Sequence, residues 1–126
     1  MLFEIVIIIL NKFPVFVGIK KKMKLWYIYI MSNKHQGVIY VGVTDNLMER
    51  VKEHKLKVYP DSFTARYNCD KLIYFEEWEN GFEATKREKQ LKKWKRDWKV
   101  NLIEDMNPTW MDISMNWNFN FNKIRK

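Results

Sequence analysis

Apolar and polar residues follow the pattern of β-strands along three segments of the chain. Residues 25–31, 38–44 and 71–78 are rich in β-branched and aromatic side chains, which favour strands. The first two are separated by the polar turn sequence SNKHQG, so they predict an antiparallel hairpin. With the turn centred between residues 34 and 35, Tyr29 would lie directly opposite Tyr40.

Two further segments have apolar residues three or four positions apart, as amphipathic helices do. Residues 45–57 begin with a capping-box pattern, an Asn followed three positions later by a Glu, which predicts a helix start. Residues 58–70 contain Pro, Asp, Ser and Asn and predict a loop. A second, long helix is predicted from residue 82 to about residue 106, where an Asn-Pro pair ends it.

The element order ββαβα, followed by a tail, predicts an α/β domain. Helices would flank a small three-stranded sheet that contains antiparallel strands. The long helix would present one apolar stripe to the sheet, and its two tryptophans are expected in the core rather than on a base-stacking surface. That stripe consists of Ala84, Leu91, Trp94, Trp98 and Leu102.

The first 22 residues differ from the rest in their hydropathy. Apolar runs at 5–10 and 15–19 are interrupted by polar residues and a proline, which does not fit a transmembrane helix. A signal peptide would carry positive charge before its apolar region, but Glu4 stands there and three lysines come afterwards. We expect residues 1–22 to be a non-essential extension, residues 23–116 to form the domain, and residues 117–126 to form a tail. A membrane anchor is the alternative for the extension.

The charge of the chain is concentrated in one segment. The formal net charge is +8, and eight Lys or Arg residues fall between positions 86 and 99. Such a cluster predicts a polyanionic partner, nucleic acid or an acidic membrane surface, although a solvated helix face would have the same composition. Cys69 is the only cysteine, which excludes an intramolecular disulfide and a cysteine-based zinc cluster. A single cysteine fits a reducing, intracellular setting, so a cytoplasmic location is expected.

A group of chemically active residues follows the predicted elements in order. Tyr29 and Tyr40 are predicted on one face of the hairpin, and Arg50 and His54 lie four positions apart on the first helix. Glu88 is a lone carboxylate at the margin of the apolar stripe in a helix otherwise rich in Lys and Arg. Each feature has an ordinary explanation: a cross-strand aromatic pair, a surface Arg/His pair, or an ion pair of Glu88 with a neighbouring cation. Together they predict a catalytic site.

These residues resemble the motifs of the GIY-YIG nuclease domain. The sequence has YIY at positions 27–29 and YVG at positions 40–42, followed by Arg50, His54 and Glu88. The likeness is closest to the small, stand-alone bacterial members related to the N-terminal nuclease domain of the UvrC excision-repair subunit, and it covers residues 24–116. Tyr27 stands where the name-giving glycine would be, and Val43 stands where some relatives carry a lysine.

The resemblance implies a metal-dependent endonuclease that hydrolyses DNA, with RNA not excluded and a structure-selective role or one in DNA repair or recombination expected. It implies that Glu88 binds Mg²⁺ or Mn²⁺ and that no small-molecule cofactor is needed. The implied catalytic residues are Tyr29, Tyr40, Arg50, His54 and Glu88. Which tyrosine is the general base stays open, and a non-catalytic nucleic-acid-binding module of the same fold is the alternative.

The side chains suit this chemistry. Arg50 can bind phosphate oxygens bidentately, and His54 can relay a proton near neutral pH. The basic helix is expected to contact the nucleic-acid backbone without regard to sequence. The residues expected to do so are Lys86, Lys89, Lys92, Lys93, Lys95 and Arg96.

Overall fold

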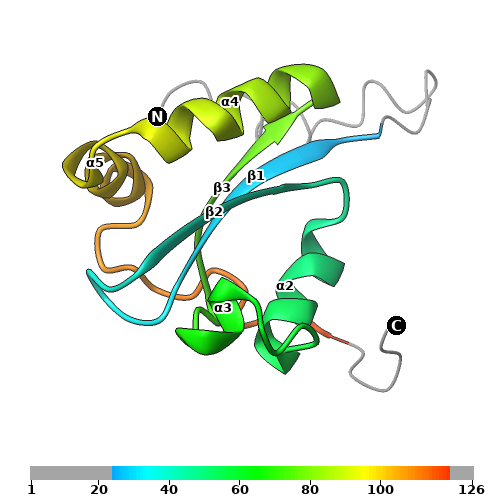
Figure 1. Cartoon of the computed structure of the whole chain (residues 1–126), viewed down its shortest axis with the longest axis vertical. Coiled ribbons are helices and arrows are strands. Elements are labelled where there is room, and N and C mark those ends of the chain that lie inside the picture. The colour runs from blue at the N-terminus through cyan, green and yellow to red at the C-terminus, as the bar shows by residue number, and fades with distance from the viewer. Residues whose placement is uncertain (1–23, 120–126) are drawn as a thin grey trace.

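A computed structural model describes residues 24–119, and within them the chain forms a three-stranded sheet with helices on both faces (Figure 1). The extension predicted for residues 1–22 lies outside the described residues, as does the end of the tail. The domain boundaries expected from the sequence therefore stay predictions.

The three predicted strands are all present. They are β1 (Trp26–Ser32), β2 (Ile39–Thr44) and β3 (Lys71–Trp78). β1 is the central strand and pairs antiparallel with both neighbours, giving the order β2-β1-β3. The α/β class and the sheet flanked by helices are thus confirmed.

The register of the hairpin differs from the predicted one by two residues. Tyr29 pairs with Gly42, and Tyr40 pairs with Met31. The turn is centred one position later than expected, because Gln36 adopts a left-handed conformation with φ of 55°. Since side chains alternate between faces with a period of two, this shift leaves Tyr29 and Tyr40 on the same face of the sheet.

The helix after β2 begins as its sequence predicts. α2 (Leu47–Leu56) is capped by Asn46, whose Oδ1 accepts a hydrogen bond of 3.1 Å from the backbone N–H of Glu49. The segment predicted as a loop contains a short helix, α3 (Phe63–Arg66), capped by Ser62. The loop prediction was therefore wrong at this place, which becomes part of the candidate site.

The predicted long helix is two helices, α4 (Gly81–Lys93) and α5 (Arg96–Met106). Trp94 and Lys95 between them are extended, with ψ of 148° and 151°. The break turns the chain so that both helices can pack on the sheet.

The break also changes which tryptophan is buried. Trp94 packs against the core as predicted. Trp98, predicted to join it, is 52% exposed, because α5 starts afresh after the break. Leu102, also predicted in the stripe, is buried as expected, together with Ile103.

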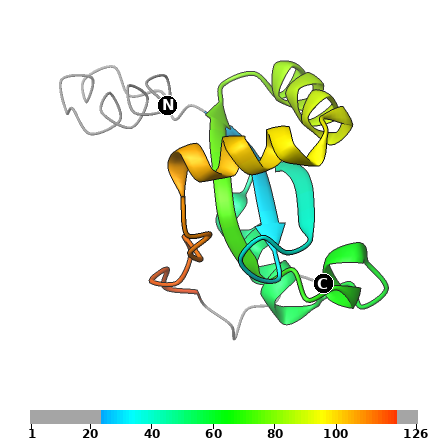
Figure 2. The same cartoon turned by 90° about the vertical axis from the view of Figure 1, so that its left-hand side faces the viewer.

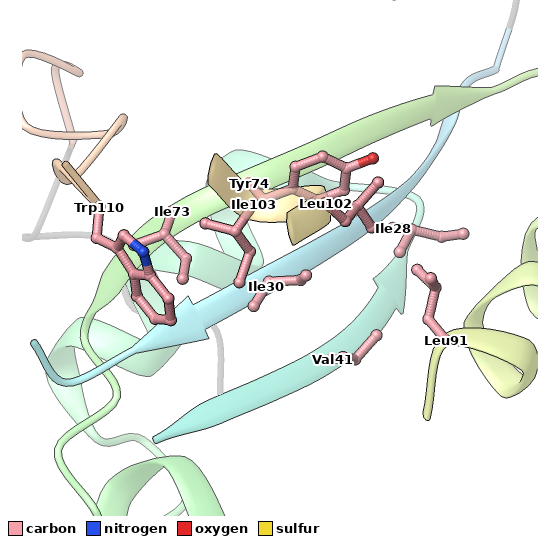
Figure 3. Packing of buried hydrophobic residues seen from close by; sticks show 9 residues of the cluster. All are labelled: Ile28, Ile30, Val41, Ile73, Tyr74, Leu91, Leu102, Ile103 and Trp110. Carbon is pink, nitrogen blue, oxygen red and sulfur yellow. The ribbon is translucent and has the colours of Figure 1, made fainter. Parts of the chain in front are cut away.

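Two buried clusters separate the faces of the sheet. α4 and α5 cover one face, where Leu91 lies beside Val41 and Ile28 (Figure 3) and α5 crosses over β3 and β1 (Figure 2). α2 covers the other face, where Leu47 and Val51 pack with residues of β1 and β3. In the stretch from residue 24 to 119, no helix has both the length and the apolar character needed to cross a membrane.

Candidate functional site

Four of the predicted catalytic residues lie together on the face of the sheet covered by α2. Tyr29 comes from β1, Tyr40 from β2, and Arg50 and His54 from α2. The Tyr29 hydroxyl lies 2.9 Å from Nε2 of His54. The ring centroids of Tyr29 and Tyr40 are 6.2 Å apart, and those of Tyr40 and His54 are 5.6 Å apart. The structure therefore brings these four residues into one site.

The glycine opposite Tyr29 makes room for this arrangement. A Cβ atom on Gly42 would lie 2.5 Å from Cζ of Tyr29 and 2.6 Å from its hydroxyl oxygen. The phenol ring of Tyr29 thus lies directly over the backbone of β2 and is fully buried. Any side chain at position 42 would push the ring away from His54.

His54 is held at both ring nitrogens. Its Nδ1 lies 2.8 Å from Oγ1 of Thr64, a buried residue of α3, while Nε2 contacts Tyr29. Thr64 in turn lies 3.3 Å from Oγ of Ser62, the residue that caps α3. The sequence analysis missed Thr64, and the only available signal was the capping pattern of Ser62 within the expected loop.

Burial keeps both members of the Tyr29–His54 pair uncharged. It lowers the pKa of His54 to about 4, and the positive charge of Arg50 acts in the same direction. It raises the pKa of Tyr29, helped by the Tyr40 phenol and opposed by the Arg50 guanidinium. Near neutral pH the pair is therefore a neutral phenol and a neutral imidazole, which can accept a proton.

Arg50 is held by Glu53 and lies beside Tyr29, whose hydroxyl it also contacts. Its Nη1 donates a hydrogen bond of 3.2 Å to Oε1 of Glu53, whose side chain is only 2% exposed. Its Nε is buried and has no hydrogen-bond partner within residues 24–119. A buried, unpaired N–H is unfavourable, and the guanidinium that carries it also lines the cleft described below.

A surface cleft of about 340 Å³ opens onto these groups. Besides site residues predicted from the sequence, α3 and the segment before it contribute to its wall. The lining residues are Tyr40, Arg50, Glu53, His54, Lys57, Tyr59, Ser62, Phe63 and Thr64.

Comparison with known proteins identifies the family of the chain. Residues 25–101 match the family described as the GIY-YIG catalytic domain. The chain belongs to the GIY-YIG family. This match includes the elements from β1 to the first part of α5, and it confirms the resemblance seen in the sequence motifs.

Three curated bacterial proteins are similar to this GIY-YIG chain. UPF0213 protein CPE1444 of Clostridium perfringens is 39% identical over 77 residues, covering 61% of this chain and 81% of the relative. A UPF0213 protein of Syntrophus aciditrophicus is 33% identical over 78 residues, 62% of this chain and 88% of the relative. UPF0213 protein DP2720 of Desulfotalea psychrophila is 31% identical over 67 residues, 53% of this chain and 60% of the relative. No solved structure gives a significant match.

Glu88 stands apart from the other four residues of this GIY-YIG site. It is carried by α4, which packs on the opposite face of the sheet from α2. Its Oε2 forms an ion pair of 2.9 Å with Nζ of Lys92, and its side chain is 12% exposed. The ion pair with a neighbouring lysine, considered in the sequence analysis, is thus present, and no contact in the described part of the chain joins Glu88 to Tyr29, Arg50 or His54.

The basic residues of α4 and α5 differ in their surroundings. The Lys86 ammonium lies 5.7 Å from the ring centroid of exposed Phe82, and that of Lys95 lies 6.0 Å from the ring of Trp98. Arg96 donates hydrogen bonds of 2.8 Å to the carbonyl oxygens of residues 36 and 37. Arg96 therefore connects the start of α5 to the β1–β2 turn through these hydrogen bonds.

Proposed function

We propose that this GIY-YIG protein is a divalent-metal-dependent endonuclease that hydrolyses phosphodiester bonds of DNA. The observation that supports this most strongly is the buried Tyr29–His54 hydrogen bond beside an Arg50 guanidinium that lines the cleft. A proton acceptor and a phosphate-binding cation then share one open cleft.

Arg50 is the residue that binds the scissile phosphate. Its planar guanidinium lines the cleft and can donate to phosphate oxygens. Glu53 fixes one side of the guanidinium, so the fork is oriented before the substrate arrives. Preorganised donors of this kind stabilise charge that develops on phosphate oxygens.

Tyr29 and His54 move the proton. The Tyr29 hydroxyl donates to Nε2 of neutral His54, which leaves Nδ1–H to donate to Thr64. For a water to lose its proton to Tyr29 as Tyr29 passes its own proton to His54, the buried Tyr29 hydroxyl must become accessible from the cleft that His54 and Tyr40 line. The phosphate bound to Arg50 offsets the positive charge that otherwise disfavours the imidazolium.

Glu88 would hold the metal ion. Its helix α4 lies beside the edge strand β2, which also carries Tyr40, so a phosphate bound by Arg50 would have to reach the ion around that edge of the sheet. Within residues 24–119 no three or more His, Cys, Asp or Glu side chains are grouped so as to hold a metal by themselves. Mg²⁺ often binds through one or two carboxylates, several waters and substrate phosphates, so a lone carboxylate fits an ion that enters with the nucleic acid. When bound, such an ion would supply charge neutralisation at the phosphate and the leaving oxygen. Glu88 would have to exchange Lys92 for the metal.

The test is cleavage of end-labelled DNA, as duplex, single strand and branched junction, with Mg²⁺ or with EDTA. We expect cleavage only with metal, and loss of cleavage in Glu88→Gln with unchanged DNA affinity and thermal stability. Glu83→Gln, which removes another carboxylate from α4, should cleave like the wild type. Equal cleavage by Glu88→Gln would remove Glu88 as the metal ligand. Binding of every substrate without cleavage would leave only a nucleic-acid-binding module.

A further inference from the structure

A series of aromatic rings leads from the Tyr29–His54 pair to the surface of α3. The ring of Tyr40 is stacked with that of Phe63, with centroids 6.1 Å apart and planes at 27°. Phe63 in turn lies 4.7 Å from the ring of Tyr67. Tyr59 lines the same cleft as Phe63 and Tyr40.

The outer rings of this series are exposed. Tyr59 is 55%, Phe63 40% and Tyr67 48% exposed, and none of them belongs to either buried cluster. α3 is anchored instead by its buried Thr64 and Ala65. We call Tyr59, Phe63 and Tyr67 the aromatic surface. Because the aromatic surface contributes little to the core, its large exposed apolar area beside the cleft indicates a ligand-binding surface.

The charge around the aromatic surface suits a nucleic-acid strand. Lys57 lines the cleft next to Tyr59, and the Arg66 guanidinium lies 6.0 Å from the ring centroid of Tyr67. Cations interleaved with exposed rings can contact phosphates while the rings stack on bases.

We propose that the aromatic surface stacks on bases of an unpaired DNA strand next to the phosphate bound by Arg50. The substrate of the proposed nuclease is then single-stranded DNA or an unpaired segment. This inference rests on the proposed nuclease function. In a duplex the base faces are covered by neighbouring bases, so rings beside the cleft cannot stack on them. An unpaired strand exposes those faces, and stacking on aromatic side chains is independent of sequence.

Binding measured in EDTA separates this proposal from catalysis. Fluorescence anisotropy would give the affinity for a labelled single strand of about 12 nucleotides and for the same sequence as a blunt duplex. The variants are Phe63→Leu, which keeps an apolar side chain without a ring, and Phe63→Trp, which keeps a ring. Phe82→Ala is the matched control, since Phe82 is an exposed phenylalanine on the other face of the sheet.

We expect the wild type to bind the single strand more tightly than the duplex at equal salt. Phe63→Leu should weaken single-strand binding by about five-fold or more, the usual effect of losing one stacked base, and leave duplex binding unchanged. Phe63→Trp should retain the preference, and Phe82→Ala should change neither affinity. Thermal unfolding of each variant would identify any loss of fold, and Tyr67→Leu would then replace a Phe63 variant that unfolds.

Equal losses on single strand and duplex, or none on either, would overturn the stacking proposal. Cleavage is scored separately. Metal-dependent cleavage of uniform duplex as fast as single strand, with Phe63→Leu unaffected, would contradict the stacking proposal and leave the nuclease intact. Selective single-strand binding without cleavage would support stacking and remove the nuclease.

Discussion

The Tyr29 hydroxyl lies 2.9 Å from Nε2 of His54, and the two residues come from the central strand and from the helix on one face of the sheet. Neither residue is charged near neutral pH, because burial lowers the pKa of His54 to about 4 and raises that of Tyr29. Their contact couples the fold of the hairpin to the chemistry of the site, and it leads to testable consequences for pH dependence, packing and cleavage.

Stability should rise with pH between about 4 and 6.5 because of His54. In this range the unfolded chain binds a proton at His54, whose ordinary pKa is 6.5, and the folded protein does not. The fall to about 4 corresponds to roughly 3 kcal/mol of stability at most, present above pH 6.5 and lost as the pH falls to 4. Chemical denaturation at several pH values would measure the slope. It should shrink in His54→Gln and persist in His35→Gln; equal slopes in both variants would contradict the burial of a neutral His54.

Two substitutions of Arg50 should separate the effect of its positive charge from the effect of its planar guanidinium. Arg50→Lys keeps the cation beside His54 but loses the planar fork and Nε, so cleavage should fall by about 100-fold. The pKa of His54, followed by NMR, should stay low in Arg50→Lys. In Arg50→Ala it should rise and still remain below 6.5, because burial is the larger cause. A pKa of His54 that is the same in wild type and Arg50→Ala would refute the electrostatic coupling.

Gly42→Ala should disturb the site through Tyr29. The added Cβ would lie 2.5 Å from Cζ of a fully buried ring, and overpacking of this kind costs roughly 1–3 kcal/mol. Denaturation and cleavage should both report the change. In a Tyr29→Leu background the same substitution should be less destabilising, because the clashing ring is gone. Equal penalties in the two backgrounds would show that the ring is not the constraint.

Arg87 should matter for stability, whereas its neighbour Lys86 should not. Arg87 Nη2 lies 2.9 Å from Oε2 of Glu76, a nearly buried carboxylate of β3 that also accepts from Tyr74 and Trp78. Arg87→Ala leaves that carboxylate without its cation and should lower the unfolding free energy by roughly 3 kcal/mol. Lys86→Ala should leave stability unchanged and lower DNA affinity. The slope of log affinity against log salt concentration should fall by about one. Thermal unfolding and salt titrations of binding would distinguish them; equal stability of the two variants would contradict the role given to Arg87.

The sequence predicted the strands and the shared face of Tyr29 and Tyr40, but not the pairing of residues within the hairpin. The register depends on the left-handed conformation of Gln36, which a turn of mixed polar residues does not specify. The face was still predicted correctly, because alternation along each strand survives a shift of two residues.

The parts of the site that the sequence did not reveal depend on tertiary contacts. Thr64 becomes a partner of His54 only when α3 folds against α2. The sequence does not distinguish Glu53, which orients Arg50, from the other charged residues of its helix. The division of the basic segment into α4 and α5 falls at Trp94 and Lys95, where the sequence has no Gly or Pro to predict it. Glu88 remains a prediction from the motif, since its helix lies on the other face of the sheet.

The most direct test of the proposed chemistry is single-turnover cleavage of single-stranded DNA by Tyr29→Phe with saturating Mg²⁺. This substitution removes the hydroxyl that contacts His54 and keeps the ring that packs over Gly42. The account predicts a rate about 100-fold or more below that of the wild type, with DNA affinity unchanged and the fold intact by thermal unfolding. A Tyr29→Phe protein that cleaves at the wild-type rate would contradict the account, because the proton could not pass through Tyr29.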